Sequence, residues 1–108
     1  AAAPINAVVL GNVLAARGRV PAVDVAAADD LLFNDNRCEQ RSRGDAPAVL
    51  LTAPVALVNA NRVRGGDVSI RVSTPGTGQA LCSVIGNITT GKIDAPMRPE
   101  MTPLNLIG

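Results

Sequence analysis

The hexapeptide Val58-Asn59-Ala60-Asn61-Arg62-Val63 lies near the middle of the sequence and has similar segments on both sides. Two of them precede it, Val9-Leu10-Gly11-Asn12-Val13 and Phe33-Asn34-Asp35-Asn36-Arg37-Cys38. One follows it, Val84-Ile85-Gly86-Asn87-Ile88. Four related segments at nearly constant spacing indicate an internal repeat, and a repeat of this length is typical of solenoid architectures.

Each segment is anchored on one asparagine. The anchors are spaced by 24, 25 and 26 residues, and they are Asn12, Asn36, Asn61 and Asn87. An apolar residue stands three places before each anchor, and a small or turn-prone residue stands immediately before it. This regularity predicts that each anchor occupies the same structural position in its own turn.

The length of the repeat decides between repeat architectures. Helical repeats need two helices in about 33–47 residues, for which this period is too short. The stretches between anchors are instead short runs rich in β-branched residues and bounded by turn residues, which indicates strands. These runs span residues 20–25, 48–51, 55–58 and 68–72. Three short strands per repeat predict a parallel solenoid whose successive turns are hydrogen-bonded about 4.8 Å apart.

The anchor asparagines have two expected roles in such a solenoid. Asparagine tolerates the left-handed backbone conformation of a sharp bend better than branched residues do. Stacked asparagine side chains also bond to one another from turn to turn. We therefore predict a structural ladder of Asn12, Asn36, Asn61 and Asn87, with apolar side chains stacked beside it.

These segments resemble the right-handed parallel β-helix repeat, the fold of pectate lyases, phage tailspikes and many bacterial surface proteins. The resemblance covers about residues 7–93. The closing stretch from Val84 to Ile93, followed by Pro103-Leu104-Asn105, is similar to the C-terminal end of large bacterial β-helix proteins. The resemblance implies an all-β, right-handed parallel β-helix of about four coils. It also implies origin in a larger extracellular, surface or phage-tail-like assembly.

The sequence divides into coils over residues 1–93 and a capping tail over residues 94–108. The tail holds three prolines within residues 96–103. Because proline cannot donate to a β ladder, the tail is predicted to close that end of the solenoid. Met97, Met101, Leu104 and Ile107 are expected to cover the last coil. Residues 1–6 are too short and bland to do the same, so the first coil edge is a predicted docking surface.

Composition excludes several functional classes. The formal net charge is +1, which does not indicate a nucleic-acid protein or a polybasic membrane binder. Histidine is absent, which removes the commonest general base and metal ligand. No apolar run reaches the length of about 18 residues that a membrane helix needs. We predict neither catalytic nor metal-binding residues, and no cofactor.

Arginines follow two of the anchors directly. Arg37 and Arg62 should stack on adjacent coils, and Glu39 and Arg64, both three places after an anchor, should face each other. The functional interpretation of Arg37, Arg62, Arg64 and Glu39 is an interaction surface for anions or acidic glycans. The simpler interpretation, which we favour here, is a solvated face whose exposed ion pairs contribute about 0–1 kcal/mol each.

Other polar motifs are better explained by structure than by chemistry. Asp29-Asp30 and Asp35 are the best paired carboxylates, and we interpret them as turn residues. Arg43-Gly44-Asp45 spells an integrin-binding tripeptide that is common by chance. Asn87-Ile88-Thr89 is a formal glycosylation site, but an asparagine inside the ladder has its amide occupied. The glycine-rich segments 65–66 and 75–78 are expected to be turns, the second an alternative recognition loop.

The two cysteines are predicted to stay apart. Cys38 follows the second anchor and Cys82 precedes the fourth. Two turn spacings of about 4.8 Å exceed the Cα separation of about 7 Å that a disulfide tolerates. We expect two separate thiols that act as small apolar residues.

The function that this sequence favours is a non-enzymatic structural or interaction module. Its partners would be upstream coils of a parent chain or further copies, which pair with the open coil edge. The alternative is a carbohydrate-binding or polysaccharide-processing β-helix fragment. The absence of Trp and Tyr speaks against that alternative, since sugar-binding faces commonly use aromatic platforms.

Overall fold

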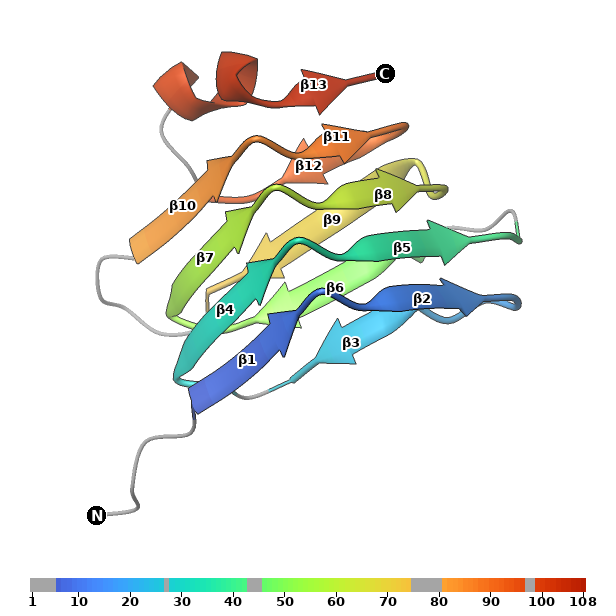
Figure 1. The fold of residues 1–108 in the computed structure, drawn as a ribbon, viewed down its shortest axis with the longest axis horizontal. Helices are drawn as coiled ribbons and strands as arrows, with labels where there is room; N and C mark the ends of the chain where they lie inside the picture. Colours follow the sequence, from blue (N-terminus) through green and yellow to red (C-terminus); the bar gives the residue numbers. More distant parts are fainter. Residues whose placement is uncertain (1–5, 27, 43–45, 75–80, 97–98) are drawn as a thin grey trace.

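The computed structural model describes residues 6–26, 28–42, 46–74, 81–96 and 99–108, which form a parallel β-solenoid (Figure 1). The chain winds through about three turns, and successive strands along each turn belong to three different sheets. The predicted all-β class and parallel stacking are confirmed. The predicted count of about four coils is not, because the four stacked strands of one sheet enclose three complete turns.

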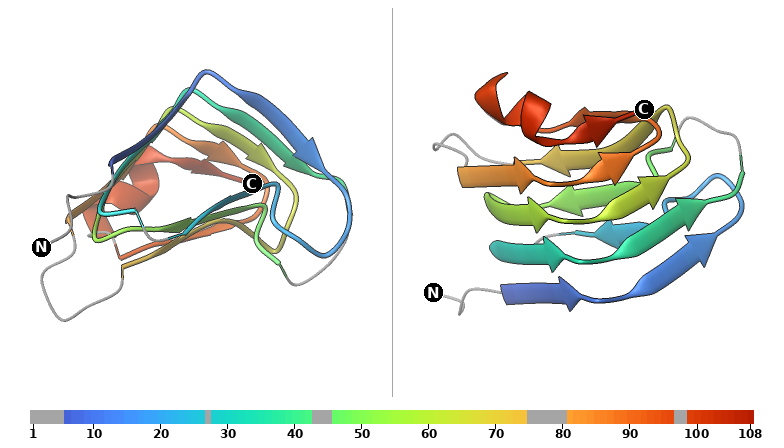
Figure 2. Two further views of the ribbon diagram at one scale, coloured as in Figure 1. Left: turned by 90° about the horizontal axis from the view of Figure 1, so that it is seen from below. Right: turned by 45° about the horizontal axis from the view of Figure 1, so that its top comes forward.

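The three sheets are arranged around a common interior (Figure 2). Sheet A contains β1 (Asn6–Leu10), β4 (Asp30–Asn34), β7 (Val55–Asn59) and β10 (Leu81–Ile85). Sheet B contains β2 (Val13–Ala16), β5 (Arg37–Gln40), β8 (Arg62–Arg64), β11 (Ile88–Thr89) and β13 (Leu106–Ile107). Sheet C contains β3 (Val23–Val25), β6 (Val49–Thr52), β9 (Val68–Ser73) and β12 (Lys92–Asp94).

Parallel pairing keeps each repeat position in one column. Val9, Phe33, Val58 and Val84 are paired in register from β1 to β10, so the apolar residue three places before each anchor stacks on its equivalents. Phe33, Val58 and Val84 are fully buried. Since side chains alternate between the two faces of a strand, their neighbours in the sequence point outward. The interior is therefore aliphatic around one central phenylalanine.

The left-handed bend of each turn lies one residue before the expected position. At the corner between sheets A and B, the residue directly before each anchor asparagine has a positive φ: Gly11 (64°), Asp35 (57°), Ala60 (58°) and Gly86 (72°). The prediction that the asparagine itself adopts this conformation is wrong. The preceding residue turns the chain, which leaves the asparagine side chain free to point into the stack.

Predicted strand runs match the observed strands with one clear difference. The run over residues 20–25 is reduced to β3, which begins at Val23. Pro21 precedes β3 and lacks the backbone N–H that a ladder requires, and Val20 is 59% exposed. The runs over 48–51, 55–58 and 68–72 correspond to β6, β7 and β9 within a residue at either end.

The last described segment lies across one end of the solenoid (Figure 1). The 3-10 helix η1 (Pro99–Leu104) contacts β10, and β13 then pairs with β11. Leu104 is 53% and Ile107 37% exposed, so the expectation that these two side chains cover the last coil is not confirmed. Met97 lies outside the described residues, as does the side chain of Met101.

Candidate functional site

The asparagine ladder runs along the corner between sheets A and B. Asn36, Asn61 and Asn87 are all buried. The Oδ1 atom of Asn61 accepts hydrogen bonds from the backbone N–H and the Nδ2 atom of Asn36, at 3.0 and 3.1 Å. The Nδ2 atom of Asn61 donates to Phe33 O at 2.8 Å and to Asn87 Oδ1 at 2.9 Å. Asn36 and Asn87 repeat this pattern, so the ladder has a direction.

The ladder has a fifth rung that the period does not reveal. Asn105 Oδ1 accepts from the backbone N–H and the Nδ2 atom of Asn87, and Asn105 Nδ2 donates to Val84 O. Asn105 follows Asn87 by 18 residues, which is shorter than the repeat of 24–26. The helix η1 replaces the usual strands of a turn, and it returns the chain to the ladder early.

At the other end the ladder stops at Asn12. Its backbone N–H and Nδ2 atom both donate to Asn36 Oδ1, and Nδ2 also donates to Leu10 O. Within the described part of the chain, no group donates to the Oδ1 atom of Asn12. The same atom accepts two hydrogen bonds in each of the four other rungs. Asn12 therefore carries an acceptor for which this end of the structure supplies no rung.

A second, outward pair of asparagines accompanies the ladder. Asn34 Oδ1 accepts from the backbone N–H of Asn59, and Asn59 Oδ1 accepts from the backbone N–H of Ile85. Our sequence reasoning missed this pair. The signal was available, since Asn34 and Asn59 stand two places before Asn36 and Asn61 in two adjacent copies.

The first turn is an edge in all three sheets. β1, β2 and β3 are the terminal strands of sheets A, B and C at the same end of the solenoid. Four apolar side chains of these strands are only half-buried, whereas Leu31, Phe33 and Leu51 of the second turn are completely buried; the four are Ala7, Val9, Leu14 and Val25. This end exposes both strand edges and the side of the core.

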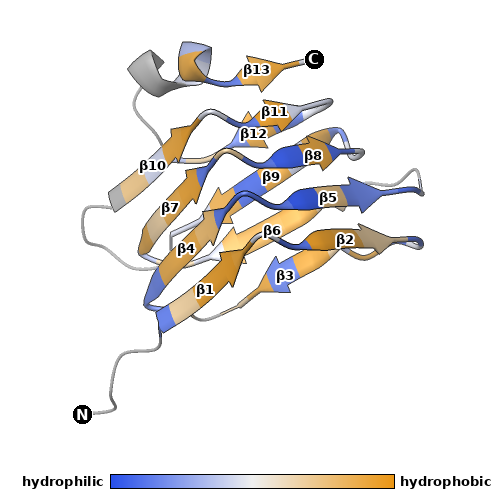
Figure 3. Cartoon of the chain, in the orientation of Figure 1, coloured by the Kyte–Doolittle hydropathy of each residue, from blue (hydrophilic) through white to orange (hydrophobic). Residues whose placement is uncertain are grey.

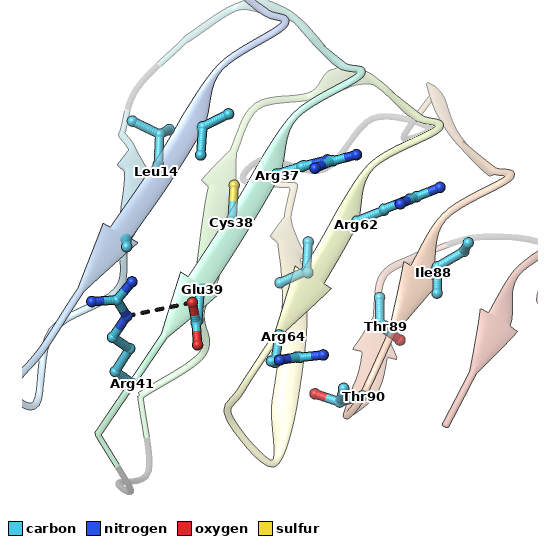
Figure 4. A pocket seen from close by; sticks show the side chains of 13 residues that line it. Leu14, Arg37, Cys38, Glu39, Arg41, Arg62, Arg64, Ile88, Thr89 and Thr90 are labelled. Carbon is cyan, nitrogen blue, oxygen red and sulfur yellow. Dashed lines mark hydrogen bonds and ion pairs between the residues drawn. The ribbon is translucent and has the colours of Figure 1, made fainter.

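The predicted arginine surface lies on the outer face of sheet B (Figure 4). Arg37 pairs in register with Arg62, and Glu39 pairs in register with Arg64. These residues line an open groove of about 440 Å³ together with Arg41, Thr90 and the apolar side chains of Val13 and Ile88. Figure 4 shows the side chains of Arg37 and Arg62 lying parallel on adjacent strands. The predicted stacking of these positions is thus observed.

The pairing of charges differs from the simple expectation. Glu39 makes an ion pair with Arg41 at 3.4 Å rather than with Arg64 opposite it. Among the described residues, no carboxylate pairs with Arg37, Arg62 or Arg64. The groove therefore has three guanidinium groups whose charge this part of the chain leaves uncompensated.

The candidate carboxylates do not form a site. Asp30 begins β4 and Asp35 follows its end, so a five-residue strand of about 16 Å separates them. Asp35 occupies the left-handed turn position, as the turn interpretation requires. The described residues contain no group of acidic and cysteine side chains that could hold a metal ion. Arg43-Gly44-Asp45 and residues 75–78 lie outside the described residues.

The amide of Asn87 is fully used inside the ladder. Asn87 is 0% exposed, and its Nδ2 atom donates to Val58 O and Asn105 Oδ1. This agrees with the expectation that the amide of this formal glycosylation site is engaged in the hydrogen bonds of the ladder.

Both cysteines are free thiols, as predicted. Burial raises the pKa of the Cys38 thiol from 9.0 to about 11, and burial also raises the pKa of Cys82. Cys38 is buried beneath the arginine groove, whereas Cys82 is half-buried. Protonated, shielded thiols are poor nucleophiles, so neither is suited to covalent chemistry.

The Cys38 pKa predicts a fall in stability at alkaline pH. The unfolded thiol ionises at about pH 9, whereas the folded thiol stays protonated to about pH 11. The contribution of Cys38 is therefore complete below pH 9 and declines as the pH rises toward 11. The thermal midpoint should fall over this interval, and it should fall less in Cys38→Ala. If the thermal midpoints of the unmodified chain and of Cys38→Ala fall by the same amount over this pH interval, the buried Cys38 thiol is not the cause.

Comparison of the chain with protein-family models, with curated proteins and with solved structures finds no match. In the described ranges, no helix has the length and apolar character required to cross a membrane. What the geometry defines is a class, a parallel β-solenoid with a directional asparagine ladder.

Proposed function

We propose that the chain is a non-enzymatic structural and interaction module of the right-handed parallel β-helix type. In this proposal the β1-β2-β3 edge receives a further solenoid turn, and residues 94–108 close the opposite end. The module would act within a larger surface or phage-tail-like assembly. There it would present a rigid surface and continue the solenoid that a preceding polypeptide segment forms.

The unfilled acceptor of Asn12 carries this proposal. In the other rungs, Oδ1 receives one hydrogen bond from a backbone N–H and one from an Nδ2 atom of the preceding turn. A docking segment that places an asparagine above Asn12 would supply the same two donors. The edge therefore favours a parallel turn with an asparagine at its A–B corner over an arbitrary strand.

The exposed core of the first turn supports the same occupant. Ala7, Val9, Leu14 and Val25 are half-buried, and a further turn would cover them as the second turn covers its neighbours. Burial of apolar area stabilises by about 25 cal/mol per Å². Such a turn would therefore add backbone pairing, ladder hydrogen bonds and core burial together.

The opposite end is less suited to continuation. Gly86 N–H donates to Leu104 O at the corner after β10, and Leu106 N–H donates to Asn87 O, so residues 99–108 pair with β11 of sheet B and reach the adjoining corner. Asn105 N–H donates to Thr102 O within the same segment. Part of this end is therefore already paired within the chain, which favours assembly at the β1-β2-β3 edge and a terminated stack over an open filament.

An added turn tests whether the edge accepts one. Asn6 and Val55 both pair in register with Asp30, so a copy of residues 30–54 can replace residues 1–5 and continue directly into Asn6. We expect a higher thermal midpoint and at least about tenfold slower hydrogen exchange in β1 and β2, which are edge strands in the present chain. The measurement is exchange followed by mass spectrometry.

The matched control carries Asn36→Ala in the added copy alone. It preserves the length and every apolar residue of the added turn but removes the Nδ2 donor of the ladder, so it should gain less protection than the intact extension. If β1 and β2 exchange as fast as in the unmodified chain, while the added residues exchange as an unstructured segment, the edge does not accept a turn and the proposal is wrong.

A further inference from the structure

The groove on the outer face of sheet B is positively charged, whereas the rest of the chain has more acidic than basic residues. Four arginines and one glutamate line it, although the chain carries ten Lys and Arg residues against nine Asp and Glu residues. Only six basic residues then remain elsewhere, against eight acidic ones. The chain, with a net charge of +1, therefore combines a basic groove with an acidic excess among its remaining residues.

The centre of this groove stacks like charges. Arg37 lies over Arg62 on adjacent strands, which are about 4.8 Å apart. Like charges directly opposite each other destabilise a sheet. An oxyanion between the two guanidinium groups would remove this repulsion and accept charge-assisted hydrogen bonds from both.

The ends of the same column are apolar. In register, Val13 precedes Arg37, whereas Ile88 and Leu106 follow Arg62. Val13 is 80%, Ile88 43% and Leu106 67% exposed. Figure 3 shows this pattern as hydrophilic β5 and β8 between the more hydrophobic β2 on one side and β11 and β13 on the other. The column spans four strand spacings, or about 19 Å.

We propose that this groove binds an acidic segment of a partner protein, with carboxylates on Arg37 and Arg62 and apolar side chains against Val13 and Ile88. The arginines require acidic residues at the centre of the partner segment. The exposed aliphatic side chains of the groove favour apolar residues on either side of that centre. Arg64 lies beside the column and supplies a third cation. This surface is separate from the β1-β2-β3 edge and does not depend on the function proposed for it.

Other polyanions fit the groove less well. The single aromatic residue of the chain, Phe33, is fully buried in the core. Single-stranded nucleic acids and sugar rings are commonly held on exposed aromatic platforms, and the groove provides none. Aliphatic flanks beside paired guanidinium groups match the mixed side chains of a polypeptide instead.

Fluorescence anisotropy with a labelled peptide tests the proposal. The probe is a peptide of glutamates flanked by leucines, and its matched control has glutamine in place of every glutamate. We expect the glutamate peptide to bind and the glutamine peptide not to bind. Loss of one charge-assisted partner in Arg62→Gln should weaken its binding by at least about tenfold. Arg71→Gln is the charge control, because Arg71 lies on sheet C and pairs with Asp94.

The flanks give a second, independent readout. Val13→Thr and Ile88→Thr preserve charge and branched shape, and we expect the pair to weaken peptide binding by about threefold to tenfold. Circular dichroism checks that each variant remains folded.

Four results would overturn the proposal. They are absence of peptide binding to the unmodified chain, an equal loss in Arg71→Gln, no effect of the two flank substitutions, and stronger competition by polygalacturonate or single-stranded DNA than by unlabelled peptide. The last would assign the groove to a glycan or a nucleic acid.

Discussion

Replacing Asn61 by alanine is expected to lower the free energy of unfolding by about 3–5 kcal/mol. The substitution removes four buried hydrogen bonds, two accepted by Oδ1 and two donated by Nδ2. It leaves the backbone N–H of Asn36 and the carbonyl of Phe33 without these partners in a dry interior. Each buried polar group left unpaired costs about 1–3 kcal/mol.

Urea unfolding followed by circular dichroism measures this effect, since the chain has no Trp or Tyr for fluorescence. Arg62→Ala is the adjacent control. Arg62 is exposed and makes no ion pair within the described residues, so its loss should change stability by less than about 0.5 kcal/mol. Similar small effects for Asn61→Ala and Arg62→Ala would mean that the ladder does not stabilise the fold.

Replacing Phe33 by alanine is the second large expected effect, a destabilisation of about 3–5 kcal/mol. Phe33 is the largest fully buried side chain and stacks between Val9 and Val58. The backbone around it is fixed by parallel pairing on both sides, so the strands cannot collapse into the space that alanine leaves. The cavity should therefore persist and add to the lost burial.

Two variants make this measurement specific. Phe33→Leu keeps most of the volume and should cost less than about 1.5 kcal/mol. Leu32→Ala lies on the outward face of the same strand, where the side chain is only half-buried, and should also cost less than Phe33→Ala. If Leu32→Ala is as destabilising as Phe33→Ala, the assignment of inward and outward faces in β4 is wrong.

The two substitutions act on residues that a hydrogen bond joins. The Nδ2 atom of Asn61 donates to the carbonyl of Phe33, so the ladder holds the backbone of the residue that fills the core. The same relation joins Asn36 to Val9 and Asn87 to Val58. The double variant should therefore deviate from additivity, because the two sites share a partner.

Local turn geometry was only partly predictable. Asparagine is a common left-handed residue, so assigning it to the bend was reasonable, yet Gly11, Asp35, Ala60 and Gly86 take that conformation. The asparagine side chain must reach the preceding turn, and this requirement places the left-handed conformation at the residue before the asparagine. This requirement exists only once turns are stacked, and it outweighs the intrinsic cost of a positive φ at Asp35 and Ala60.

The sequence by itself determined the repeat, the strand-rich turn of about 25 residues and the columns of equivalent residues, because register in a parallel stack follows directly from the period. Tertiary structure decided what the period does not encode. It returned Asn105 to the ladder out of phase, since η1 shortens the last turn, and it paired Glu39 with Arg41. It also left Asn12 with an unfilled acceptor and bordered the predicted arginine surface with Val13 and Ile88, because both depend on which surfaces the stack leaves uncovered.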